Sequence, residues 1–207
     1  MGAEAWSALA NVILALAAVA GSVAAFGGLR TWKSQQTWHN DHDLALQTLI
    51  AAYNYRDKLF TIRDPYVSND EMVPSSATHQ RKMETEEDLF DGMSVAYARR
   101  WQSLNQVRAG LSATLIETEA LWGCDLSNYF KKLHGLEQEL RSNTIRKLKL
   151  LNSHLDESSK SAVRDLKSKF RDILYDKFSD DDEFRNEFST GLTSIETFLG
   201  KKLGRNP

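Results

Sequence analysis

The pattern of hydrophobic and polar positions begins with one long apolar run over residues 5–29, which reads AWSALANVILALAAVAGSVAAFGGL. The run has 25 residues and no charged side chain, and a helix needs about 20 residues to cross the hydrocarbon core of a bilayer. We therefore predict a transmembrane helix over residues 5–29, preceded by a short outer tail at 1–4. Two alternatives fit less well. A cleaved signal peptide would need a basic segment before the run. A core helix of a soluble protein would normally show a polar stripe, whereas only Ser7, Asn11 and Ser22 are polar here.

The charges at the two ends of this run differ. Glu4 precedes it, whereas Arg30 and Lys33 follow it. Because an excess of Lys and Arg marks the cytoplasmic side of a membrane helix, we expect the N-terminus outside and residues 30–207 in the cytosol. The single cysteine, Cys124, cannot form an internal disulfide, which agrees with a reducing compartment.

Small residues recur at helical spacing within the predicted span. Pairs of Ala and Gly four positions apart lie along one helix face, where they let two helix backbones approach closely. Asn11 could form a hydrogen bond across such a contact. We therefore expect self-association of the membrane helix through Asn11, Ala17, Gly21, Ala24 and Gly28.

Beyond residue 30, hydrophobic residues recur at three- and four-residue steps and nowhere alternate with period two, which predicts helices throughout. A juxtamembrane helix over 30–64 should continue into a helical bundle and stop before Pro65, because the residue before a proline resists the helical conformation. A flexible loop at 65–80 should follow, since it holds two prolines and many polar residues.

The remainder of the bundle should occupy residues 81–203, with a tail at 204–207. Its hydrophobic stripes predict helices over about 84–122, 126–153, 159–178 and 181–203. Gly123 suits a helix end, Asp125 suits the next helix start, and Ser179 or Asp180 suits the start of the last helix. The expected fold is all-α, with a transmembrane helix followed by a cytosolic bundle of four to five helices.

Four charged residues form the main candidate site: Arg56, Asp57, Arg63 and Arg100. Arg56 and Arg63 are seven residues apart and so share a helix face. We interpret this group as a structural ion pair in which Arg56 meets an acidic residue of another helix and fixes the helix register. The alternative is an anion or nucleotide pocket lined by Arg56, Arg63, Arg99 and Arg100.

The remaining chemistry is sparse. The densest group of potential metal ligands is His39 and His42 with Asp41 or Asp43, but a structural zinc site needs about four ligands and no second cluster accompanies these residues. The sequence has no phosphate-binding glycine loop, no nucleophile elbow and no Arg-to-His motif of HEPN-type ribonucleases. We expect no cofactor, no metal and no enzyme activity. The net charge of −2 also argues against specific nucleic-acid binding.

Short motifs follow the predicted span in a fixed order: Trp32-Lys33-x-Gln35, Tyr53-x-x-Arg56-Asp57, Arg63-x-Pro65-Tyr66, Tyr97-x-x-Arg100-Trp101 and Glu119-x-Leu121-Trp122-Gly123. Over most of the chain up to about residue 140, this arrangement resembles a widespread group of uncharacterised bacterial single-pass membrane-anchored helical-domain proteins. The resemblance implies a bacterial inner-membrane location and a cytosolic helical bundle, and it implies no reaction. The architecture is also similar to that of CRISPR-associated membrane accessory proteins that assemble as pores.

The sequence thus favours a non-enzymatic interaction or signalling protein of the bacterial inner membrane. Its expected partners are the lipid bilayer, a second copy of the chain and a cytosolic protein. The alternatives are an oligomeric membrane effector or pore, for example in phage defence, and an enzyme that uses the arginine-lined pocket.

Overall fold

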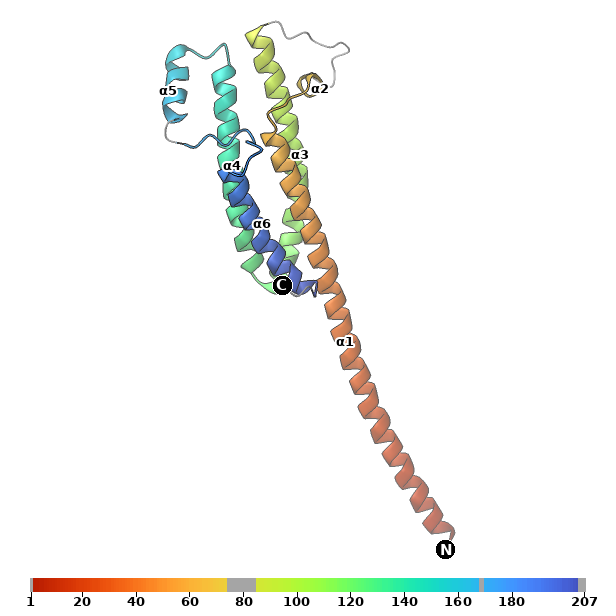
Figure 1. The fold of residues 1–207 in the computed structure, drawn as a ribbon. Coiled ribbons are helices and arrows are strands. Elements are labelled where there is room, and N and C mark those ends of the chain that lie inside the picture. The colour runs from red at the N-terminus through yellow and green to blue at the C-terminus, as the bar shows by residue number, and fades with distance from the viewer. Residues whose placement is uncertain (1, 74–84, 168–169, 205–207) are drawn as a thin grey trace. The chain divides into compact units, whose positions relative to one another are not determined.

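The computed structural model describes residues 2–73, 85–167 and 170–204, and within these ranges it leaves out the side chains of 3–13, 15, 17, 23, 166 and 167. Over the described residues the chain is all-α and contains no strand, which confirms the predicted class. Figure 1 shows the helices α1 (Ala3–Arg63), α2 (Asn69–Met72), α3 (Glu86–Trp122), α4 (Asp125–Leu151), α5 (Glu157–Lys167) and α6 (Glu183–Lys202).

The chain divides into two compact units, and the first, Met1–Asp43, contains the first part of α1. All described side chains from residue 14 to residue 40 are exposed. Among the described residues, no helix combines the length and the hydropathy that crossing a membrane requires, so the predicted span at 5–29 gains no support from the structure.

The second unit, Leu44–Pro207, is a helical bundle. Residues 44–63 of α1 and the helices α3, α4 and α6 run alternately up and down, and α5 lies beside α4 (Figure 1). This arrangement confirms the predicted all-α helical bundle.

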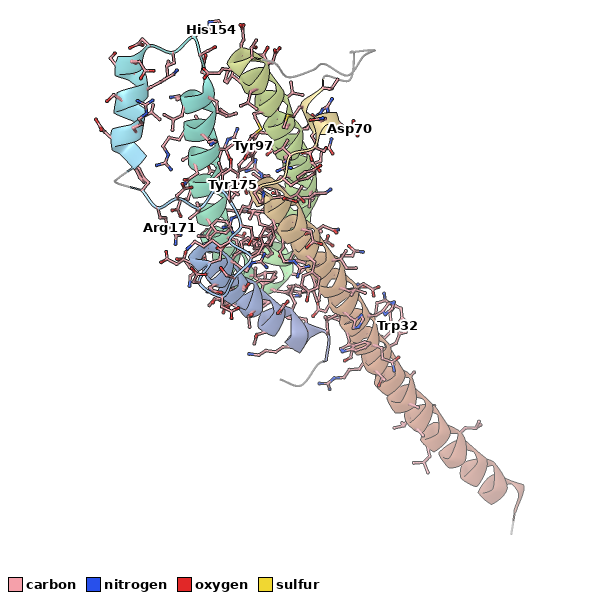
Figure 2. All side chains as sticks on the ribbon, turned by 45° about the horizontal axis from the view of Figure 1, so that its top comes forward. Trp32, Asp70, Tyr97, His154, Arg171 and Tyr175 are labelled. Carbon is pink, nitrogen blue, oxygen red and sulfur yellow. The ribbon has the colours of Figure 1, made fainter. Side chains whose placement is uncertain are left out.

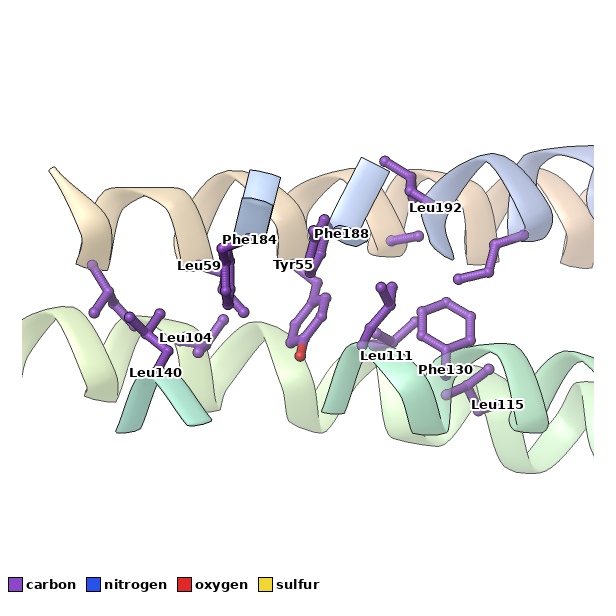
Figure 3. Packing of buried hydrophobic residues seen from close by; sticks show 14 of the residues in the cluster. Tyr55, Leu59, Leu104, Leu111, Leu115, Phe130, Leu140, Phe184, Phe188 and Leu192 are labelled. Carbon is purple, nitrogen blue, oxygen red and sulfur yellow. The ribbon is translucent and has the colours of Figure 1, made fainter. Parts of the chain in front are cut away.

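One hydrophobic core joins these four helices. Figure 3 shows Tyr55 and Leu59 of α1 facing Phe184 and Phe188 of α6, and the two phenylalanine rings stack with their centroids 6.3 Å apart. The buried positions of α6 recur at three- and four-residue steps, as its sequence pattern predicts. Burial of each such side chain contributes about 1.5–3 kcal/mol, so the stripes hold the bundle together. The described side chains of the core with no more than 1% exposure are Ala45, Ala52, Tyr55, Leu59, Ile62, Tyr97, Leu104, Leu111, Leu126, Phe130, Leu133, Leu140, Phe184, Phe188, Ile195 and Leu199.

Local signals set several helix ends as predicted. The first helix ends at Arg63, two residues before Pro65. Gly123 closes α3 at a φ of 83°, a left-handed conformation that glycine adopts without steric cost. Thr85 and Asp88 form a capping box at the start of α3. At the next helix the prediction was wrong, because Cys124 is the N-cap of α4 and Asp125 lies inside its first turn.

Three further predictions need correction. The N-cap of α6 is Asp182, and neither Ser179 nor Asp180 starts that helix. The predicted helix at 159–178 ends at Lys167. Residues 170–182 form a non-helical segment that contains bends and a short turn. Part of the predicted loop at 65–80 is instead the short helix α2, which Ser68 caps through a hydrogen bond from the N–H of Glu71. Residues 74–80 of that predicted loop lie outside the described residues.

Candidate functional site

The side chain of Arg63, at the end of α1, lies at the centre of a buried ion cluster. It is 1% exposed and is the largest of the fully buried side chains. Its Nε donates to the carbonyl oxygen of Ile173 at 2.9 Å, and its Nη2 donates to the carbonyl oxygen of Tyr175 at 2.9 Å and to Asp182 Oδ2 at 2.8 Å. A second carboxylate, that of Asp176, lies 4.0 Å from Nη1. We call Arg63, Asp176 and Asp182 the Arg63 cluster.

Asp182 connects this cluster to the start of α6. It is the N-cap of α6, and its carboxylate accepts hydrogen bonds from the backbone N–H groups of Arg185 and Lys177 as well as from Arg63. Burial alone would raise the pKa of Asp182, but these three donors stabilise the charged form and lower the pKa to about 2. The carboxylate therefore remains charged inside the protein.

The same cluster explains why residues 170–182 are not helical. Two carbonyl groups of this segment accept from the Arg63 side chain, and the N–H of Asp176 donates back to the carbonyl oxygen of Arg63 at 2.9 Å. These bonds replace the hydrogen bonds that a helix would make. Asp176 also accepts from the N–H of Phe178, which adopts a φ of 53°.

A second arginine, Arg100 of α3, binds the chain that leaves α1. Its guanidinium donates to the carbonyl oxygens of Asp64 and Tyr66 at 2.8 and 2.6 Å, and its Nε donates to Glu71 Oε2 of α2 at 2.6 Å. The hydrogen bond from Arg100 is the largest cause of a lowered pKa at Glu71. Arg99 adds hydrogen bonds to the carbonyl oxygens of Asp70 and Glu71.

A third charged group lies within the bundle itself. Glu137 of α4 is fully buried, and its carboxylate accepts from the hydroxyl of Tyr55 at 2.8 Å and from Arg108 Nη1 at 2.9 Å. The ring of His134 contacts Tyr55 edge-on, and its buried Nε2 has no hydrogen-bond partner among the described residues. Burial lowers the pKa of His134, although the charge of Glu137 acts in the opposite direction.

The hydroxyl of Tyr97 on α3 is also buried and lacks a hydrogen-bond partner among the described residues. Its ring lies near Tyr175 of the non-helical segment (Figure 2). Burial is the largest cause of a raised pKa at Tyr97, so this phenol stays neutral. It offers no base or nucleophile at neutral pH.

The predicted arginine group does not share one set of partners. Arg56 is partly exposed and pairs with its neighbour Asp57 at 2.8 Å rather than with an acidic residue of another helix. Arg63 and Arg100 are buried, and each bonds to protein groups of its own. Protein acceptors bind all three nitrogens of the Arg100 guanidinium and two of the three of Arg63, whose buried Nη1 has no hydrogen-bond partner among the described residues.

The sequence did not single out the acidic partners, although two of them carry a signal. Glu137 lies on the apolar stripe of α4, between Leu133 and Leu140, where a carboxylate needs a buried partner. Asp182 lies just before the last apolar stripe, at a position suited to an N-cap. Neither signal reveals which arginine or tyrosine is the partner.

The remaining candidate groups are the histidines near Asp43 and the self-association face of the predicted span. Nε2 of His39 lies 3.4 Å and Nδ1 of His42 lies 3.6 Å from the exposed carboxylate of Asp43. Among the residues that the structure describes, no three or more potential metal ligands lie together. In the predicted self-association face, Gly21, Ala24 and Gly28 are exposed, whereas the side chains of Asn11 and Ala17 are outside the described set.

Comparison of the chain with known protein families, with curated proteins and with solved structures gives no match.

Proposed function

We propose that this protein is a membrane-anchored, non-enzymatic interaction protein whose helical bundle binds a partner in the cytosol. One observation carries the anchor. Large apolar side chains are exposed along the first part of α1, and among them are Leu14, Leu16, Val19, Phe26 and Leu29, which are 60–75% exposed. These five residues belong to the run of 25 residues without a charge at 5–29. The structure does not describe many of the other side chains of this run.

The distribution of these side chains supports a bilayer over a narrow protein contact. At about 100° per residue, the five positions spread over more than half of the helix circumference. A helix that is apolar on most sides needs surroundings that are apolar on most sides. Lipid tails provide such surroundings. A helix can lie among them because its backbone hydrogen bonds are made within the helix.

The role proposed for the bundle rests on its buried charges. Asp182, Glu137 and Arg63 are at most 1% exposed, and each has a charged partner within the bundle. Buried groups of this kind can specify one arrangement of the helices. A rigid bundle held at a membrane is suited to presenting a surface to another protein.

Alkaline extraction of membranes from cells that express the full chain tests the anchor. We expect the protein to remain in the membrane pellet, and we expect Leu16→Arg combined with Val19→Arg to release it, since an arginine at the centre of a membrane helix costs about 2.5–3.5 kcal/mol. The matched control is Ile116→Arg with Leu121→Arg on α3, where both side chains are also exposed. Release of the unaltered protein, or equal behaviour of the two double variants, would refute the anchor.

A second candidate function is an oligomeric membrane effector or pore. The observation that favours it is the open surface at Gly21 and Gly28, where an added Cβ would meet no atom within 4 Å. Two copies of the helix could approach closely at such positions. Mass measurement of the detergent-solubilised protein separates the two functions, because a strict monomer excludes a pore and leaves the anchored interaction protein intact.

A further inference from the structure

A cleft of about 440 Å³ lies between α4 and the segment that contains α5 and Phe170. Its volume falls within the roughly 300–1,000 Å³ of small-molecule sites. The cleft belongs entirely to the second unit. Its lining includes neither the residues of the Arg63 cluster nor Arg100 and Glu137. The lining residues are Gln138, Glu139, Ser142, Asn143, Ile145, Arg146, Lys149, Val163 and Phe170.

The walls of the cleft are mainly apolar. Ile145 is 48% exposed and Phe170 is 56% exposed, so both offer hydrophobic surface that the protein itself does not cover. Val163 of α5 completes this lining. An apolar molecule that occupied the cleft would remove this surface from water, which favours binding by about 25 cal/mol per Å².

Two cations and one carboxylate line the cleft. The carboxylate, Glu139, accepts from Arg171 Nε at 2.8 Å and from Arg171 Nη2 at 2.9 Å, and Arg171, at the edge of α4 and α6 (Figure 2), also donates to Glu187. The two cations that line the cleft are Arg146 and Lys149. A ligand with a negative charge is therefore complementary to this site.

Arg146 supplies the most specific feature. Its Nη1 is buried and has no hydrogen-bond partner among the described residues. Its guanidinium lies over the ring of Phe170, 5.3 Å from the ring centroid. A smaller hollow beside the cleft shares Arg146 and also contains Asp172, whose Oδ1 accepts from the N–H of Leu174. A buried guanidinium N–H without an acceptor favours an anion nearby, because an unsatisfied buried donor is destabilising.

We propose that this cleft binds a small organic anion that combines a flat apolar body with one carboxylate. The carboxylate is attracted by the charges of the Arg146 guanidinium and of Lys149. The apolar body packs against Ile145, Val163 and Phe170, with an aromatic body favoured because Phe170 and the Arg146 guanidinium both offer flat faces. This inference does not depend on the membrane anchor.

Equilibrium dialysis of 2-naphthoate against the purified full chain in a mild detergent tests the proposal, with the detergent solution alone as the blank. We expect saturable binding at one site per chain. We expect the uncharged analogue 2-naphthamide to bind at least about tenfold more weakly, since a hydrogen bond to a charged group contributes about 1.5–3 kcal/mol. Equal affinity for the two compounds, or no saturable binding of 2-naphthoate, would overturn the proposal.

Variants locate the site. We expect Arg146→Gln to weaken 2-naphthoate binding at least about tenfold and Val163→Trp to abolish it by filling the cleft. The matched control is Arg164→Gln, which removes an exposed arginine of α5 that pairs with Glu157 outside the cleft. Full binding by the Arg146 variant, or the same loss in the Arg164 variant, would place the ligand elsewhere. If Arg146→Gln changes the helix content, the comparison of the two naphthyl compounds on the unaltered chain still decides the matter.

Discussion

Arg63 and Asp182 are 119 positions apart in the sequence, and their side chains meet at 2.8 Å inside the protein. Arg63 is the last residue of α1, and Asp182 is the N-cap of α6. One ion pair thus joins the end of the first helix to the start of the last. The non-helical segment between α5 and α6 bonds to the same guanidinium, so three parts of the chain depend on one side chain.

Replacing Arg63 with methionine should strongly destabilise the bundle. The change would leave Asp182 buried without its cationic partner, and breaking a buried pair in this way costs about 3–5 kcal/mol. The control is Arg56→Met, which breaks an exposed pair with Asp57 and should cost at most about 1 kcal/mol. Chemical denaturation of the purified variants, followed by circular dichroism, measures both. Similar losses in the two variants would contradict a dominant role for the Arg63 cluster.

Acid should weaken the bundle through Asp182. Its pKa is about 2 in the folded protein and about 3.9 in an unfolded chain. Because the folded pKa is the lower one, the stabilisation is fully present above about pH 4–5 and is lost as the pH falls towards 2. Its size is about 2–3 kcal/mol.

Asp182→Asn isolates this effect, since asparagine is also a good N-cap. The variant should be less stable than the unaltered protein at pH 7, and the difference should shrink between pH 4 and pH 2. The matched control is Asp180→Asn, at an exposed position two residues earlier, which should change the free energy of unfolding at pH 7 by at most about 0.5 kcal/mol. A difference for Asp182→Asn that stayed constant over this pH range would argue against the lowered pKa.

Two tyrosines of α1 give a matched test of the buried Glu137. The Tyr55 hydroxyl donates to Glu137 in the core, whereas the Tyr53 hydroxyl donates to Glu196 at a partly buried position. We expect Tyr55→Phe to cost about 1–3 kcal/mol, because it leaves a buried carboxylate short of a donor. Tyr53→Phe should cost less than about 1 kcal/mol. Thermal unfolding of the two variants measures both losses of stability. A larger loss for Tyr53→Phe would exclude the Tyr55 hydroxyl as an important support of Glu137.

The close approach of α4 and α6 depends on Gly191. A Cβ at this position would lie 2.6 Å from Cδ2 of the buried Leu133, whereas a Cβ at Gly135 on α4 would meet nothing within 4 Å. We expect Gly191→Ala to destabilise the bundle by about 1 kcal/mol, since overpacking outweighs the better helix propensity of alanine. Gly135→Ala should stabilise it by up to about 1 kcal/mol. Midpoints of urea unfolding decide, and a stabilising Gly191→Ala would show that Leu133 has room to move.

The single exposed cysteine, Cys124, reports the proposed orientation. If the bundle is cytosolic, a membrane-impermeant maleimide should label Cys124 only after spheroplasts are permeabilised. The control carries Gly2→Cys together with Cys124→Ser, and its cysteine should be labelled in intact spheroplasts. Labelling of Cys124 before permeabilisation would reverse the orientation.

Hydrophobic spacing alone predicted most helices of this protein. The stripe from Phe184 to Leu199 and the end of α1 before Pro65 follow from local rules, because a 3.6-residue period and a proline act on the nearest residues. The same rules failed at 170–178. There Ile173 and Leu174 keep helical spacing, but they are buried in a segment that bonds to Arg63 instead of forming a helix.

The candidate sites show the same contrast between features set by neighbouring residues and features set by the tertiary structure. The sequence by itself determined the all-α class, the apolar stripes and the charge-free run at 5–29, since each depends on residues close together in the chain. Only the tertiary structure decided that Arg63 is buried while Arg56 is partly exposed, and that Arg63 pairs with Asp182 and Arg108 with Glu137. Such pairings depend on which helix faces meet after folding, and no local spacing specifies that meeting.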